Sequence, residues 1–262
     1  MTRKRKSMVD YEASDGRATI TINDPEHRNP ISVETMAGLL EATRRAVADP
    51  SVRAIVYTGA GDQVFSAGGD LSGSFVDDAI GLHQSRGALA DLFRLMWRGG
   101  KPTVARVNGH ALAGGFGLAV ACDITVCVDD ARLGVTEIKV GLWPMMITAV
   151  LVRAMPRKAI LEMMLTGRTI DADEAHRLGA VSRVVSRSEL DAVVDEIVQA
   201  LSSASPATLL LGRDAFYWVM DLGLDAGLDR LQVGLTEVAM SEDAKEGIAA
   251  FLEKRDPHYS GR

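Results

Sequence analysis

The chain has 262 residues, of which 47% are apolar and 24% charged, and it carries a formal net charge of −6. These values are typical of one globular domain with or without a smaller appended region, and they exclude a chain that is disordered throughout. The acidic balance argues against a nucleic-acid-binding protein, because such proteins present a basic surface. The two cysteines, Cys122 and Cys127, lie in one apolar run, so we expect buried free thiols rather than disulfides or a zinc site.

Residues 1–8 are predicted to form a disordered basic tail. This stretch is rich in lysine and arginine, but no apolar segment follows it, so it does not resemble a secretory signal. No apolar run approaches the ~18 residues that are needed to span a bilayer. We therefore expect a cytoplasmic protein that does not associate with membranes.

The first two thirds of the chain alternate between strand and helix patterns. Residues 17–22 alternate polar and apolar side chains, as a half-buried strand does. After a turn at 23–30, Ser32 is expected to cap a helix whose apolar residues recur at helical spacing. Further apolar strands are predicted at 54–59, 103–107 and 124–128. Strands that alternate with helices predict an α/β fold with a covered sheet.

From about Arg157 onward the pattern becomes mainly helical. Helices are predicted at 158–165, 171–178 and 189–201, with one strand at 180–185. We expect residues 9–200 to form the core and residues 201–262 to form a helical region that mediates oligomerisation. The reason is that a helical part of this size cannot bury all of its own apolar surface.

Two glycine-rich segments, 64–71 and 108–117, each follow a strand pattern or its turn. Glycine lets the backbone approach a ligand closely, and free N–H groups at such a turn or at a helix start can bind an oxyanion. The alternative interpretation is a pair of tight packing turns. Neither segment matches a dinucleotide fingerprint or a phosphate-binding loop, and the chain has no serine-hydrolase elbow and no metal-ligand spacing.

These segments resemble motifs of the crotonase (enoyl-CoA hydratase/isomerase) family. Residues 65–71 and 108–115 resemble its two oxyanion motifs, and residues 134–142 resemble the segment that carries its catalytic glutamate. Further matches follow in the family's order, at 121–124, 166–167, 172–175, 179–181 and 246–255. The resemblance implies an α/β fold of the crotonase (ClpP-like) type, a spiral of ββα units followed by a helical C-terminal trimerisation region. It also implies a homotrimer or a dimer of trimers.

The resemblance further implies an enoyl-CoA hydratase or isomerase of fatty acid metabolism whose substrate is an acyl-CoA thioester. The backbone N–H groups of Gly69 and Gly114 would hold the thioester oxygen, and Glu137 would act as general acid and base. Contacts to CoA would come from Arg28, Asn29, Ala67, Asp70 and Lys254. The acyl pocket would include Leu71, Gly117, Leu142, Trp143 and Met145. No cofactor is expected beyond the CoA moiety of the substrate.

Some of these roles have a plainer alternative. Arg28 and Lys254 are equally consistent with solvated surface charges, and Lys254 would reach the CoA of a neighbouring subunit rather than of its own. Ser72 stands where a lysine that contacts CoA is common in the family, so one familiar contact is missing.

Gly117 is the main departure from the family's pattern, because it stands where two-glutamate hydratases carry their first glutamate. The apolar segment 142–147 resembles the branch that contains methylglutaconyl-type and isohexenylglutaconyl-type CoA hydratases. A single carboxylate, Glu137, suits either hydration or double-bond isomerisation, and an apolar acyl pocket should raise its pKa. The alternatives are an acyl-CoA-binding protein with little catalysis and a CoA-thioester decarboxylase or hydrolase.

Overall fold

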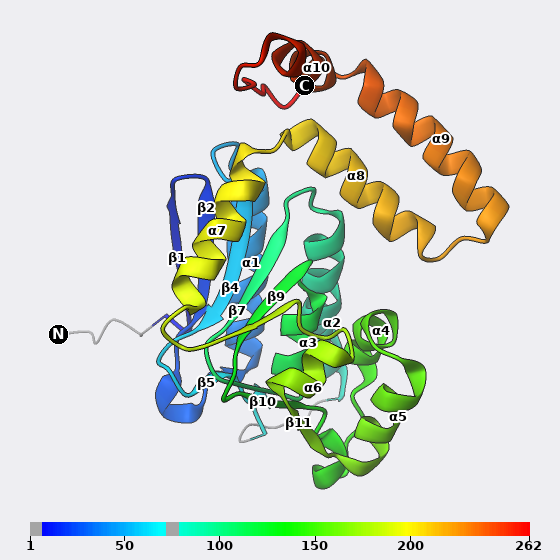
Figure 1. Ribbon diagram of the computed structural model, residues 1–262. Coiled ribbons are helices and arrows are strands. Elements are labelled where there is room, and N and C mark those ends of the chain that lie inside the picture. The colour runs from blue at the N-terminus through cyan, green and yellow to red at the C-terminus, as the bar shows by residue number, and fades with distance from the viewer. Residues whose placement is uncertain (1–6, 72–78) are drawn as a thin grey trace.

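The computed structural model describes residues 7–71 and 79–262, and it is built around a six-stranded sheet (Figure 1). The strands of this sheet, in spatial order, are β1 (Val9–Ser14), β2 (Arg17–Ile22), β4 (Ala54–Gly59), β7 (Thr103–Val107), β9 (Ile124–Val128) and β12 (Arg183–Val185). Strand β1 pairs antiparallel with β2, and every other neighbouring pair is parallel. Parallel neighbours need crossover connections, which place helices on the faces of the sheet.

The predicted strands of this sheet are confirmed. Strand β4 is buried along its whole length, because α1 (Val33–Ala48) and α7 (Leu190–Ser203) lie on opposite sides of the sheet (Figure 1). Helix α1 begins where predicted, since the Ser32 hydroxyl accepts a hydrogen bond of 3.1 Å from the N–H group of Thr35. The edge strand β1 was not predicted, although its residues alternate apolar and polar side chains; its second half is exposed.

Short strands bring the two glycine-rich segments together. A four-stranded sheet has the order β11 (Thr169–Asp171), β10 (Arg132–Gly134), β8 (His110–Leu112) and β5 (Val64–Ser66). Strands β3 (Pro30–Ile31) and β6 (Gly68–Gly69) form a separate parallel pair. Because β5 and β8 are parallel neighbours, the residues that follow them leave the sheet at the same edge. Helix α3 (Gly114–Ala121) begins at this edge.

The remaining helices of the core cover the sheets. They are α2 (Ala79–Arg98), α4 (Met145–Ala154), α5 (Arg157–Thr166) and α6 (Ala172–Arg177), with short 3-10 helices η1 (Pro25–His27) and η2 (Glu137–Val140). The predicted helices at 158–165, 171–178 and 189–201 correspond to α5, α6 and α7. Residues 1–6 of the predicted basic tail lie outside the described residues.

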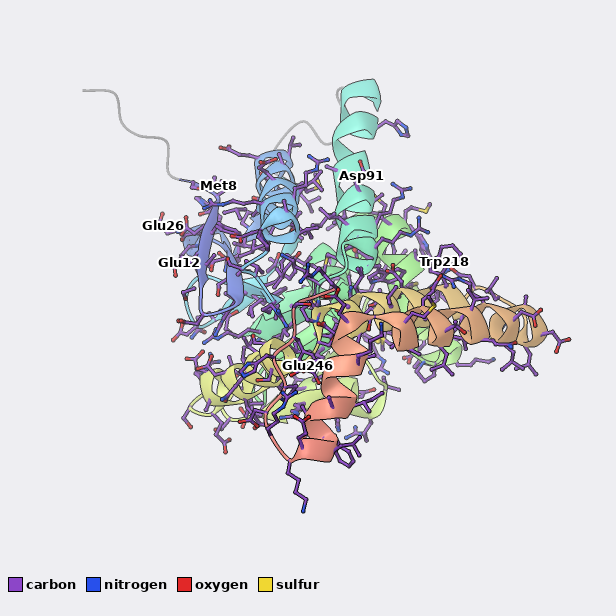
Figure 2. The ribbon with its side chains drawn as sticks, turned by 90° about the horizontal axis from the view of Figure 1, so that it is seen from above. Met8, Glu12, Glu26, Asp91, Trp218 and Glu246 are labelled. Atoms are coloured by element: carbon purple, nitrogen blue, oxygen red, sulfur yellow. The ribbon has the colours of Figure 1, made fainter. Side chains whose placement is uncertain are left out.

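Three helices end the chain: α8 (Pro206–Val219), which packs beside α2, and α9 (Leu224–Met240) and α10 (Glu242–Glu253), which lie farther from the sheet (Figure 1). Figure 2 shows α2, which carries Asp91, and the α8–α9 pair, near Trp218, projecting from the body in different directions. Large apolar side chains of this region are exposed, among them Leu224 at 78% and Phe251 at 82%. Among the described residues, no helix has the length and hydropathy required to cross a membrane.

Helix α8 is fastened to the sheet through the carboxylate of Asp123. This carboxylate accepts hydrogen bonds from the N–H group of Thr103 at 2.6 Å, from the Arg213 guanidinium at 2.9 and 3.1 Å, and from the Tyr217 hydroxyl at 2.5 Å. The side chains of Arg213 and Asp123 are only 11% and 19% exposed. The carboxylate therefore compensates a largely buried guanidinium while it joins α8 to the start of β7.

We expect Asp123→Ala to lower the free energy of unfolding by about 3 kcal/mol, because a largely buried guanidinium loses its counter-charge. Urea unfolding followed by circular dichroism measures the loss. The matched control is Asp195→Ala, which breaks a 2.6 Å ion pair with Arg17 but removes a carboxylate that is 65% exposed. It should cost less than about 1 kcal/mol. Equal losses in the two variants would contradict the assignment.

Candidate active site

A cavity of about 480 Å³ lies where the two glycine-rich segments, η2 and the first turn of α4 meet. Its volume lies within the range of small-molecule sites. Residues named from the sequence that line it are Ala67, Gly69, Leu71, Gly114, Glu137, Leu142, Trp143 and Met145. Residues that were not anticipated also line it, including Ile31, Met36, Leu89, Thr136, Val140 and Ile147, and so does Met146. The first three of these come from β3, α1 and α2, which no local motif connects to the site.

The glycine at position 68 lets the two segments touch. Its φ is +92°, and a Cβ at this position would lie 2.6 Å from the Cβ of Ala113 and 3.0 Å from the nitrogen of Gly114. A larger residue is therefore excluded by both conformation and space. Gly114 and Gly69 are also neighbours, since a Cβ at Gly114 would lie 3.9 Å from the nitrogen of Gly69. The two predicted oxyanion donors are thus brought close together on one wall of the cavity.

The start of helix α3 supplies one of these N–H groups. Its first hydrogen bond runs from the N–H group of Gly117 to the carbonyl of Ala113, at 3.1 Å. The N–H groups of the first helical turn have no partner within the helix, and Gly114 is the first helical residue. Ala113 holds this geometry at φ 49° and ψ −127°, which is rare for alanine and is stabilised by a 2.8 Å bond to the carbonyl of Gly134.

Glu137 enters the cavity from the first residue of η2, which ends at Gly141 with φ 75°. Its Oε2 atom is buried, and within the described parts of the chain this atom has no hydrogen-bond partner. Burial raises the pKa of the Glu137 carboxyl above its ordinary value, while the backbone N–H groups of Glu137 and Thr136 act in the opposite direction. The raised pKa expected from the sequence is confirmed, and such a group is a reasonable general acid and base.

Ile147 occupies the space beside Gly117. A Cβ at Gly117 would lie 2.2 Å from Cγ2 and 2.5 Å from Cβ of Ile147, which is 3% exposed. Gly117 was expected in the acyl pocket, but it is buried in α3, and Ile147 lines the cavity on this side. A glutamate at position 117 would collide with α4. The packing of α3 against α4 therefore leaves no room for a second carboxylate at this position.

The residues expected to contact CoA lie in different environments. Arg28 is exposed beside the cavity, and its carbonyl accepts a 3.0 Å hydrogen bond from the N–H group of Ala67. Asn29 is fully buried, and its amide donates to the carbonyls of Ala60 and Val64 at 3.0 and 2.8 Å. This amide therefore holds the turn together and is not presented to a ligand. Lys254 is exposed at the end of α10, in the region that extends away from the sheet (Figure 1).

Asp70 and Ser72 complete the set of residues considered for CoA. Asp70 directly follows β6 and is half-buried next to the cavity-lining Gly69 and Leu71. Ser72 lies outside the described residues. Contacts from Arg28, Ala67, Asp70 and Lys254 to CoA stay predictions.

Comparison with known proteins assigns this fold and cavity to a class of enzymes that act on CoA thioesters. The family model for enoyl-CoA hydratase/isomerase matches residues 12–262. A putative enoyl-CoA hydratase of Thermus thermophilus is 39% identical over 247 residues, which are 92% of this chain and 96% of that protein. The chain therefore belongs to the enoyl-CoA hydratase/isomerase family, and the crotonase fold and the enzyme class expected from its sequence are confirmed.

Other relatives and solved structures agree with this membership. The (E)-benzylidenesuccinyl-CoA hydratase of Thauera aromatica is 34% identical over 97% of this chain and 99% of its own length. The carnitinyl-CoA dehydratase of Salmonella typhimurium is 35% identical over 93% of this chain and 94% of its own. The crystal structure of an enoyl-CoA hydratase from Mycobacterium smegmatis superposes with a TM-score of 0.92 at 32% identity, covering 97% of this chain and 99% of that one.

A double-mutant cycle tests the packing of Gly117 against Ile147. We expect Gly117→Ala to cost about 2 kcal/mol of unfolding free energy, because the new methyl group overlaps Ile147. In an Ile147→Ala background the same substitution should cost almost nothing. Gly114→Ala is the control, since its methyl group would meet no atom closer than 3.6 Å. Additive losses at 117 and 147 would contradict the contact.

Proposed function

We propose that this enzyme adds water to the double bond of a 2-enoyl-CoA thioester, with Glu137 as its single acid and base. Gly69 and Gly114 donate backbone N–H groups to the thioester oxygen. The observation that carries the proposal is the placement of a buried carboxyl with a raised pKa in the same cavity as these two glycines. The catalytic roles of the three residues are part of the proposal.

The proposed reaction needs only one carboxylate. Ionised Glu137 accepts a proton from the water whose oxygen bonds to the β-carbon. The electron pair of the double bond shifts to join the α-carbon and the carbonyl carbon, and the carbonyl pair moves to the thioester oxygen. The two backbone N–H groups stabilise the resulting enolate, which strengthens both hydrogen bonds. Protonated Glu137 then gives its proton to the α-carbon and becomes ionised again. The two hydrogens and the oxygen of one water are added on the same face.

A second candidate reaction is isomerisation of the double bond. It is favoured by one observation, the apolar Ile147 in the place beside Gly117 where a second carboxylate would help to position water. In that reaction Glu137 removes a proton from one carbon of the acyl chain and returns it to another. Hydration is placed first because the relatives described above include two hydratases and a dehydratase.

We also propose that the C-terminal helices mediate assembly into a homotrimer or a dimer of trimers. The exposed apolar side chains of α9 and α10, such as Leu235 at 71% and Phe251 at 82%, support this proposal. Lys254 would then lie close enough to a neighbouring subunit to contact its CoA. The division into a core at 9–200 and a helical region at 201–262, the cytoplasmic location, the role in fatty acid metabolism and the absence of a further cofactor stay predictions.

Glu137→Gln should lower kcat/KM by a factor on the order of 10² to 10⁴, because the amide cannot exchange a proton. Binding of a saturated acyl-CoA should change little, since the two side chains have the same size. Purified protein is incubated with crotonyl-CoA, a 3-enoyl-CoA and methylglutaconyl-CoA, and the products are followed by mass spectrometry. Glu196→Gln, on the exposed side of α7, is the matched control.

Each product in this assay has one meaning. Added water supports hydration, and an isomer without added water supports isomerisation. Free CoA indicates a hydrolase, loss of carbon dioxide indicates a decarboxylase, and unchanged substrate indicates a binding protein. Full activity of Glu137→Gln would remove Glu137 from the mechanism.

The pH dependence of kcat/KM should report the ionisation of Glu137. The proposed reaction starts from the ionised carboxyl, so the rate rises with pH as the proton is lost. Because burial raises the pKa, the midpoint of this rise should lie above 4.5, the ordinary value for glutamate. Initial rates with crotonyl-CoA between acidic and neutral pH measure it. A midpoint at or below 4.5, or an identical rise in Glu137→Gln, would assign the ionisation to another group.

A further inference from the structure

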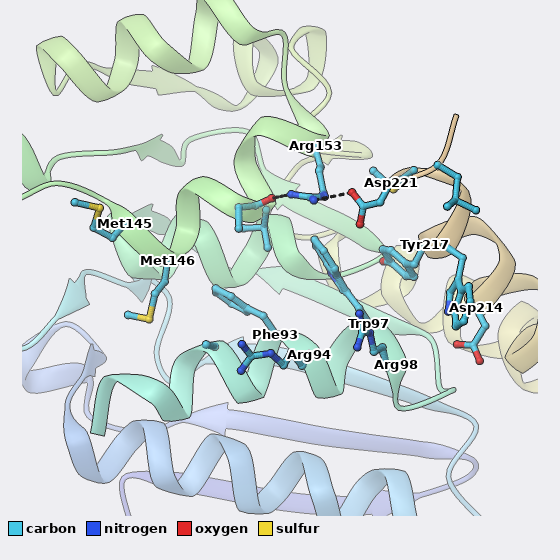
Figure 3. Close-up of a pocket in the computed structure, with 16 residues that line it drawn as sticks. Phe93, Arg94, Trp97, Arg98, Met145, Met146, Arg153, Asp214, Tyr217 and Asp221 are labelled. Carbon is cyan, nitrogen blue, oxygen red and sulfur yellow. Dashed lines mark hydrogen bonds and ion pairs between the residues drawn. The ribbon is translucent and has the colours of Figure 1, made fainter. Parts of the chain in front are cut away.

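A second, larger cavity of about 590 Å³ lies between α2, α4 and α8 (Figure 3). It adjoins the Glu137 cavity, because Met145 and Met146 line both. The first turn of α4, which carries these methionines, therefore separates the two spaces. No motif in the sequence pointed to the larger one.

The far wall of this cavity is aromatic and fixed in place. Trp97 stacks on Tyr217 with ring centroids 5.0 Å apart and an interplanar angle of 14°. The indole N–H of Trp97 donates to the carbonyl of Ala121 at 2.9 Å, and the Tyr217 hydroxyl donates to Asp123 at 2.5 Å. Because their polar atoms are engaged, these residues offer mainly ring surface to the cavity. Phe93 adds a third ring from α2.

Some of the charged groups at this cavity are held in ion pairs. Arg153 donates to Asp221 at 2.7 Å and to the carbonyl of Ala149 at 2.8 Å, which ties α4 to the turn after α8 (Figure 3). Arg94 donates to Asp91 at 2.7 Å. These pairs reduce the pull of the cavity on a charged ligand. Arg98 and Asp214 add one charge of each sign to a lining that is otherwise mainly apolar.

The partition between the two cavities is made of adaptable side chains. Methionine has three rotatable bonds and a polarisable sulfur, so it can move aside for an apolar ligand at low cost. Met145 is 74% exposed, and Met146 is half-buried against the core. A long or bulky acyl group whose thioester is held at Gly69 and Gly114 would have to pass these two side chains to enter the larger cavity.

We infer that the larger cavity receives the distal end of the acyl group and that it selects substrates whose acyl chain ends in an aromatic ring. This inference rests on the proposed function, because it requires the thioester to sit at Gly69 and Gly114. A ring entering past Met145 and Met146 would pack against Trp97 and Phe93, and aromatic pairs of this kind favour offset or edge contacts. Short acyl groups would use the Glu137 cavity alone.

Ala149 offers the sharpest test, because it lines the larger cavity and not the smaller one. We expect Ala149→Trp to weaken the binding of phenylpentanoyl-CoA about tenfold or more while butyryl-CoA binds as before. Titration calorimetry with these saturated thioesters measures both affinities without any turnover. Ala192→Trp, at an exposed position of α7, is the matched control. Decanoyl-CoA, which has a long chain without a ring, should lose less affinity than the phenyl compound.

Three results would overturn the inference. Equal losses for phenylpentanoyl-CoA and butyryl-CoA, with an unchanged circular dichroism spectrum, would show that the cavity does not distinguish a ring-ended acyl chain from a short one. Unchanged affinity for both would show that the acyl chain does not enter the cavity. If Ala149→Trp changed the molecular mass of the assembly in solution but neither affinity, the cavity would be assigned to contact with a second copy of the chain. Hydration of crotonyl-CoA by the unmodified enzyme tests the proposed function separately, so the two can fail independently.

Discussion

The site depends on one close approach between main chains, where Gly68 meets Ala113 and Gly114. At this point the start of β6 and the start of α3 are so near that a single methyl group would not fit. Two other features of the fold make this contact possible. The parallel pair of β5 and β8 delivers both segments to the same edge, and the unusual backbone of Ala113 starts α3 there. Two N–H groups on one cavity wall are the result.

Much of the fold follows from local pattern in the sequence, because buried parallel strands and capped helices leave clear signals. The strands β2, β4, β7 and β9 and the Ser32 cap were predictable for this reason. The edge strand β1 was missed although residues 9–14 alternate apolar and polar side chains, and its last three residues are exposed. The residues Ile31, Met36 and Leu89 also escaped prediction, because only the tertiary fold brings three separate elements to one cavity.

The candidate site, like the fold, could be predicted only in part from the sequence. Gly69, Gly114 and Glu137 lie in motifs that are readable in sequence, and the structure brings them to one cavity. Asn29 was misjudged because an asparagine in a turn looks available, whereas the fold buries its amide between two carbonyls. The role of Ile147 was hidden for a related reason. Its effect arises from contact with Gly117 on another helix, which residue spacing along the chain does not encode.

The two halves of this site differ in how they respond to mutation. The proposed thioester donors belong to the main chain, so most single substitutions elsewhere in the cavity leave them in place. The proposed acid and the apolar lining belong to side chains. They come from the short helix η2, from the first turn of α4, and from β3, α1 and α2. A lineage with this architecture can therefore exchange its reaction or its preferred acyl group through a few nucleotide changes while it keeps the activation of the thioester. That separation offers an evolutionary route to many related enzymes from one scaffold.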